Sequence, residues 1–120
     1  MSVGIVGGSV SPSTALTLNA QTGTTYTFVL TDANNTLVTA SNASAQTYTI
    51  PPNSSVAYPI GAQLNIIQIG AGQVSFAQGS GVTIASSGAT STAPKCRVQY
   101  SAATAIKVNT DSWYVVGDIA

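Results

Sequence analysis

The chain has 120 residues, a formal net charge of zero at pH 7, and only 5% charged residues. This length suits one domain with a modest core of its own. A neutral chain lacks the basic surface that holds a phosphate backbone, so the composition argues against nucleic-acid binding. No run approaches the ~20 apolar residues that cross a bilayer. Near-zero charge also weakens the repulsion between copies and favours association.

The composition predicts an all-β protein. Hydrophobic residues make up 44% of the chain, Glu is absent, and Thr, Val, Ile, Tyr and Gly are abundant. The first segment, Met1–Thr24, is instead rich in Gly, Ser and Thr, and has one short apolar alternation. It is either a flexible leader or an extended N-terminal arm that orders against a neighbouring subunit. We therefore expect an arm over residues 1–24 and a single β domain over residues 25–120.

The first half of the expected domain contains three predicted strands. Thr25–Thr31 alternates apolar and polar residues, and Leu37–Ser41 follows a turn cluster, which predicts a hairpin. The next strand is Gln46–Ile50, and Pro51-Pro52 ends it because proline cannot donate to a sheet ladder.

The middle of the chain predicts a three-stranded meander. Gln63–Ile69 is the most hydrophobic strand, and Gly70-Ala71-Gly72 leads into Gln73–Phe76. A second glycine turn precedes Val82–Ile84. In the C-terminal part, Cys96, Val98 and Tyr100 alternate, Ile106 and Val108 share one face, and a last strand covers Trp113–Val116. About eight to nine short antiparallel strands indicate a single β-sandwich or barrel.

The residue inventory argues against catalysis and against metal or cofactor sites. The chain has no His, no Glu and one Cys, so no zinc site or Ser-His-Asp triad can be built. Gly70-Ala71-Gly72 lacks the third glycine of a nucleotide-binding loop, and no helix follows it. A buried Lys107 beside Asn109 and Asp118 would allow an internal amide cross-link, although no Glu is present to assist.

The candidates for partner contact lie near the C-terminus. Lys95 and Arg97 flank Cys96 and point away from it, either toward a partner or as charges that keep an edge strand from aggregating. Trp113 and Tyr114 adjoin on opposite faces of one strand, so one should lie in the core and the other at the surface or an interface.

From about Thr47 to Asp118 the chain resembles a module of tailed-bacteriophage structural proteins. The resemblance rests on Thr49-Ile50-Pro51, on Pro59-Ile60-Gly61 before the strand Leu64–Ile69, and on the glycine-separated segments that follow. These segments are Gly70-Ala71-Gly72 with Val74 and Phe76, Gly79-Ser80-Gly81-Val82-Thr83-Ile84, and the ending Tyr100, Trp113 and Gly117-Asp118.

The resemblance implies a non-enzymatic virion protein. Related modules occur at the ends of tail fibres and as small separate proteins. The chain has its own Met1 and only a short leader, with no fibre shaft before the module. This favours a capsid decoration, or cement, protein that binds the major capsid protein at the capsid surface as a homo-oligomer, typically a trimer. The alternatives are a tail-fibre module that recognises a host glycan through Trp113, Tyr114 or Tyr100, and a tail or neck structural subunit.

Overall fold

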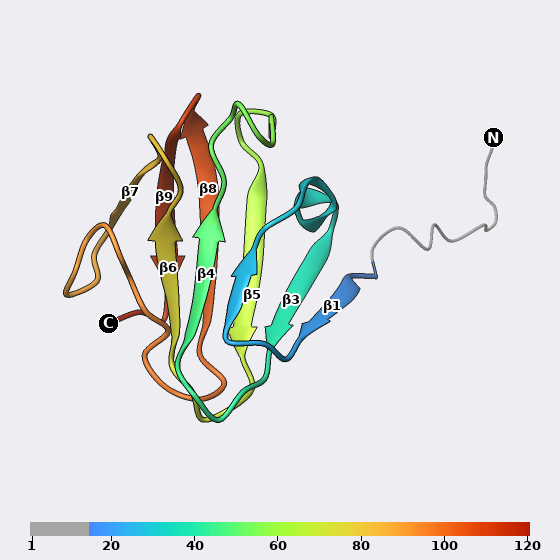
Figure 1. Cartoon of the computed structure of the whole chain (residues 1–120), viewed down its shortest axis with the longest axis vertical. Helices are drawn as coiled ribbons and strands as arrows, with labels where there is room; N and C mark the ends of the chain where they lie inside the picture. Colours follow the sequence, from blue (N-terminus) through green and yellow to red (C-terminus); the bar gives the residue numbers. More distant parts are fainter. Residues whose placement is uncertain (1–14) are drawn as a thin grey trace, which may run out of the picture.

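The computed structural model describes residues 15–120 and shows a β protein with nine strands and one short 3-10 helix in that range (Figure 1). The strands are β1 (Thr17–Gln21), β2 (Thr25–Thr27), β3 (Thr36–Ala40), β4 (Gln46–Ile50), β5 (Gln63–Gln68), β6 (Val74–Gln78), β7 (Thr83–Ser86), β8 (Ala102–Asn109) and β9 (Ser112–Gly117). The 3-10 helix covers Leu30–Ala33.

The strands form two sheets, and the chain winds between them. The larger sheet has the order β1-β3-β5-β8-β9-β7 and the smaller one β2-β4-β6, so the first six strands alternate between the two. Neighbours among these six strands are parallel and in register, as in the pairs Thr17 with Thr36 and Gln46 with Val74. The first six strands thus wind into a regular two-sheeted coil, in which each turn contributes one strand to each sheet. In Figure 1, β1 lies at one edge of the larger sheet and β7 at the other.

The expectation of a β-rich chain with about nine strands is confirmed, but the expectation of antiparallel pairing throughout is wrong. Among the pairs between the nine described strands, the antiparallel ones are those of β8, with β5 on one side and β9 on the other. β7 is parallel to β9. Parallel neighbours arise because each strand of the coil is followed by a crossing to the other sheet, so the chain returns to its starting sheet in the same direction.

The predicted hairpin and meander are also wrong for this reason. β2 lies in the small sheet and β3 in the large one, and the 3-10 helix with Asn35 (φ 52°) carries the chain across. β5, β6 and β7 likewise do not pair with one another. The glycine segments between them are corners between sheets.

Gly70 and Gly72 occupy a corner where successive turns of the coil touch. A Cβ on Gly72 would lie 1.8 Å from the carbonyl oxygen of Ser44, and one on Gly70 would lie 2.5 Å from the backbone of Asn42. The Gly72 N–H donates to the Asn42 carbonyl at 2.8 Å. Only glycine permits this approach, so both glycines serve the stacking of one turn on the previous one.

One hydrophobic core lies between the sheets and draws on both. The small sheet contributes Tyr48 and Phe76, whose rings join Tyr26 and Phe28 in an aromatic cluster with centroids 5.6 to 6.2 Å apart. On the side of the large sheet, Trp113 packs edge-on against Tyr58 with a centroid distance of 5.4 Å. These contacts fix the inner face of each strand, and therefore also the face that each strand turns outward.

Two other predictions concern the ends of the domain. Residues 1–14 of the predicted arm lie outside the described residues, and Thr17–Gln21 of the same segment forms β1. The predicted alternation over residues 96–100 is wrong beyond Cys96. A turn takes its place, with Val98 and Tyr100 exposed and Tyr100 at φ 69°. The Ser101 hydroxyl accepts the Val98 N–H and stabilises this turn.

Candidate functional site

The outward-pointing side of the six-stranded sheet, here called the outer face, is built from uncharged side chains. Because register aligns the strands, its side chains form rows across the sheet. The main row contains Leu18, Leu37, Asn65, Thr104 and Val116; the two flanking rows contain Ala20, Thr39, Ile67 and Ala102, and Gln63, Ile106, Tyr114 and Ala85.

The outer face combines exposed apolar side chains with small polar ones. Leu18 is 66% exposed, Tyr114 55% and Val116 50%. Scattered exposed apolar residues are ordinary on a soluble protein, whereas a contiguous set without charge is typical of an interaction surface. The polar groups on the face are partly paired among themselves, as where the Thr104 hydroxyl donates to Asn65 Oδ1 at 2.8 Å.

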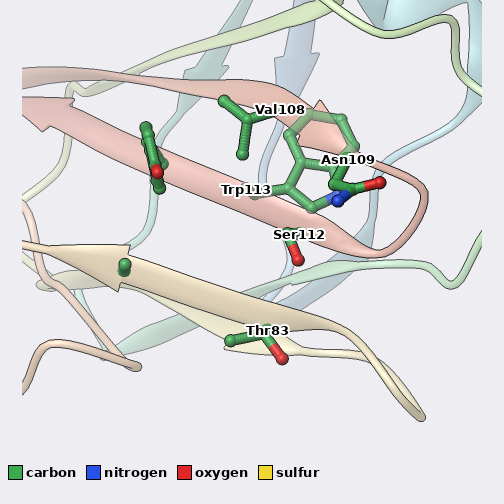
Figure 2. A pocket seen from close by; sticks show the side chains of 7 residues that line it. Thr83, Val108, Asn109, Ser112 and Trp113 are labelled. Atoms are coloured by element: carbon green, nitrogen blue, oxygen red, sulfur yellow. The ribbon is translucent and has the colours of Figure 1, made fainter.

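A shallow hollow of about 300 Å³ opens at the β7 side of the outer face (Figure 2). Tyr114 lines it, and Figure 2 shows the side chains of Thr83, Asn109 and Ser112 around it. An exposed aromatic ring beside hydroxyl and amide groups can stack on one face of a small polar ligand and hydrogen-bond its edge.

The prediction for Trp113 and Tyr114 is confirmed in its geometry. Trp113 is buried in the core beside Tyr58, and Tyr114 points outward on the same strand. Of the two, Tyr114 is therefore the residue that a partner can reach. Cys96 is fully buried, and burial raises the pKa of its thiol to about 11.

Lys95 and Arg97 are both exposed, on either side of Cys96, but their surroundings differ. Arg97 makes a bidentate contact with Asp118, with Nε to Oδ1 at 2.7 Å and Nη2 to Oδ2 at 3.0 Å. The Ser101 hydroxyl donates to the same carboxylate at 2.6 Å.

These hydrogen bonds, the one from Arg97 first, hold the pKa of Asp118 below its usual range. The contact with Asp118 also raises the pKa of Arg97. Arg97 is thus occupied within the chain, and Lys95 remains the more accessible charge for a partner. The pairing of Arg97 with Asp118 was not predicted, because the two residues lie far apart in sequence.

Besides the Arg97–Asp118 pair, the structure shows a hydrogen-bond network around Asp32 that was not predicted from the sequence. The carboxylate of Asp32 is buried and accepts three hydrogen bonds, from Asn19 Nδ2 at 2.9 Å, Tyr26 Oη at 2.6 Å and the Val29 N–H at 2.9 Å. Burial, with the contact to Asp32, raises the pKa of Tyr26 to about 12. Since all three donors come from the first turn of the coil, this network holds β1 and the 3-10 helix together.

Within residues 15–120 we found no cluster of three or more His, Cys, Asp or Glu side chains that could hold a metal ion. No helix in the same range is long and apolar enough to cross a membrane. Comparisons of the chain with protein-family models, with curated proteins and with solved structures found no match.

Proposed function

We propose that the chain is a non-enzymatic structural protein of a tailed-phage virion that decorates and stabilises the capsid. In this proposal it binds the major capsid protein as a homo-oligomer and acts from the capsid surface. The two sheets and their shared core serve as one sandwich-like body that presents the outer face. Many copies that bind only the assembled shell would stabilise it by mass action and multivalency.

The observation that carries this proposal is the uncharged outer face. It spans all six strands of the larger sheet and exposes Leu18, Tyr114 and Val116. Burying apolar surface is favourable by about 25 cal/mol per Å². A face without charged groups also avoids the free-energy cost of removing charges from water. Such a face suits permanent contact with a capsid subunit or with another copy of this chain. The phage partner itself is suggested by the resemblance of residues 47–118 to phage structural modules.

The test uses a charge placed on the outer face. Val116→Asp introduces a carboxylate at an exposed position of the main row, and Leu30→Asp is its matched control. Leu30 is also an exposed aliphatic residue, but it lies in the 3-10 helix, outside both sheets. Each variant is mixed with capsids of the phage that encodes the chain, freed of this protein, and the bound fraction is measured by co-sedimentation.

We expect Val116→Asp to weaken capsid binding at least tenfold, because a buried unpaired carboxylate is strongly unfavourable. Leu30→Asp should bind like the unmodified chain. Absence of binding by the unmodified chain would contradict the decoration proposal. Equal binding by both variants would remove the outer face from the contact.

The hollow beside Tyr114 favours a second candidate function, recognition of a host glycan by a tail-fibre module. The ring of Tyr114 and the polar side chains of Asn109 and Ser112 line that hollow. Binding to a panel of soluble bacterial-surface oligosaccharides tests it. Tyr114→Ala should abolish binding, while Leu18→Asp, at the β1 edge of the same face, should leave it unchanged. Failure of the unmodified chain to bind any glycan of the host would contradict this alternative.

A further inference from the structure

Lys107 is a buried lysine on the inner side of β8. Its residue is 2% exposed, and its ammonium donates to Asn53 Oδ1 and to the Tyr58 carbonyl, both at 2.7 Å. Asn53 and Tyr58 belong to the loop between β4 and β5, which thus closes over the lysine. Lys107 also pairs across strands with Trp113, whose ring packs against Tyr58. The ammonium is therefore held against the loop that closes over it.

This buried cation has no carboxylate in contact. The chain has three carboxylate side chains. Asp32 accepts from Asn19, Tyr26 and Val29, and Asp118 is bound by Arg97. In the part of the chain that the structure describes, the Arg97–Asp118 pair is the one ion pair within 4.0 Å. A buried charge that is held only by neutral acceptors is costly, because it has lost its hydration without gaining a counter-ion.

The remaining carboxylate, Asp111, contacts the backbone of Asn53, the residue whose side chain Lys107 contacts. Asp111 Oδ1 accepts the backbone N–H of Asn53 at 2.7 Å. The fold therefore gathers an amine, a carboxamide and a carboxylate from two segments more than 50 residues apart, with Lys107 buried and Asn53 and Asp111 half-buried. These are the three groups that transamidation requires: a nucleophile, an electrophilic carbonyl and a proton acceptor.

We propose that Lys107 and Asn53 form an intramolecular amide bond. Asp111 lies more than 4.0 Å from Nζ, so the Lys107 ammonium gives one proton to Asp111 through a solvent water. The neutral Nζ then attacks Cγ of Asn53, which moves the carbonyl electron pair onto Oδ1. Asp111 returns a proton to Nδ2 by the same route as the tetrahedral carbon collapses, the Cγ–Nδ2 bond breaks, and ammonia leaves. A further proton from Nζ leaves with it, so the products are an amide and an ammonium ion, and nothing is oxidised or reduced.

The bond replaces a buried cation by a neutral amide and so removes the unpaired charge from the interior. It also ties the loop after β4 to β8 covalently, across a closed ring of more than 50 residues. The hydrogen-bonded partner is Asn53, whereas Asn109 and Asp118 were the partners considered from sequence. Asn109 follows the register shift at the end of β8, and Asp118 is engaged by Arg97.

The first experiment is the intact mass of the purified, denatured full-length chain. We expect it to be lower than the sequence mass by one ammonia, after allowance for removal of Met1. The Lys107→Arg variant keeps the charge but has no primary amine, and should show its full sequence mass. An unmodified chain with its full sequence mass would overturn the proposal.

Trypsin digestion locates the bond, because the chain has only three basic residues, Lys95, Arg97 and Lys107. An acylated Lys107 resists cleavage, so residues 1–95 and 98–120 should remain joined as one branched product. Cyclisation of an Asn also loses ammonia but leaves Lys107 cleavable. Ammonia loss with normal cleavage after Lys107 would therefore also overturn the proposal.

Asn53→Asp provides a chemical control. This variant loses water where the unmodified chain loses ammonia, and both give the same amide. The two cross-linked proteins should therefore have identical masses, although their sequences differ. Asp111→Asn removes the proton acceptor and should leave most of the chain uncross-linked. Cross-linking of Asp111→Asn to the normal extent would contradict the role of Asp111 in the proposed step.

Discussion

Gly72→Ala tests whether the coil is stacked as described. The added Cβ would lie 1.8 Å from the Ser44 carbonyl oxygen and 2.7 Å from that of Asn42, and both neighbours are backbone atoms. Overpacking of this kind costs about 1–3 kcal/mol even where side chains can move. The 2.8 Å hydrogen bond from the Gly72 N–H to Asn42 would be distorted as well, which costs about 1 kcal/mol more. We expect the free energy of unfolding to fall by about 2–4 kcal/mol.

Gly23→Ala is the matched control for this measurement. A Cβ there would meet nothing closer than 3.6 Å, which is ordinary contact. The same change should then be neutral or raise stability by up to ~1 kcal/mol, because Ala restricts the unfolded chain. Urea denaturation of both variants and the unmodified chain gives the two differences directly. If Gly72→Ala proved as stable as Gly23→Ala, the close contact between successive turns, and the coil built on it, would be refuted.

Three further predictions concern stability. Burial raises the pKa of Tyr48 from 10.0 to about 12 and that of Cys96 from 9.0 to about 11, so the neutral forms are favoured by folding. Each group therefore contributes to the free energy of unfolding in full below pH 9, and about 3 kcal/mol for each group is lost between pH 9 and pH 12. Urea denaturation across that pH range should show the decline. A free energy of unfolding that stays constant would contradict it. Phe76→Ala removes a ring stacked on Phe28 and should cost about 3–5 kcal/mol by the same assay, whereas a cost below ~1 kcal/mol would mean that the ring is not in the core. Asp32→Asn removes a charged acceptor of three hydrogen bonds and should lower stability by about 1–3 kcal/mol in thermal unfolding; an unchanged Tm would show that the carboxylate is dispensable.

The sequence predicts individual strands better than their pairing. Gln46–Ile50 was predicted with its observed bounds, because Tyr48 and Ile50 alternate with polar residues and Pro51-Pro52 stops the strand. Alternation shows which face of a strand is buried, but it carries no information on which strand lies beside it. Glycine between two strands normally indicates a hairpin, and the close contact of Gly72 with Ser44 depends on a segment 28 residues earlier. The parallel coil could not be read from local pattern for this reason.

In the candidate site, too, local sequence pattern predicts the faces of a strand but not the contacts between distant segments. Alternation predicted that Trp113 and Tyr114 lie on opposite faces with one of them in the core, but the structure was needed to show that Tyr114 is the outward residue. Ile106 and Val108 share a face as expected, but it is the outer face, and Ala105 and Lys107 fill the inward positions of the strand. The sequence neighbours of Lys107, Ile106 and Val108, do not show how far its side chain is buried, because the loop that covers it comes from elsewhere in the chain. Its partner Asn53 is 54 residues away, a distance that no local pattern bridges.

A cryo-EM map of the virion that carries this chain tests the central proposal most directly. The account predicts density for the two-sheeted fold at many symmetry-related positions on the outside of the capsid, with the outer face of the six-stranded sheet turned toward capsid protein or toward another copy. Density for this fold only at the tail tip, in a few copies and with the hollow beside Tyr114 directed outward, would contradict decoration and favour the receptor-binding alternative.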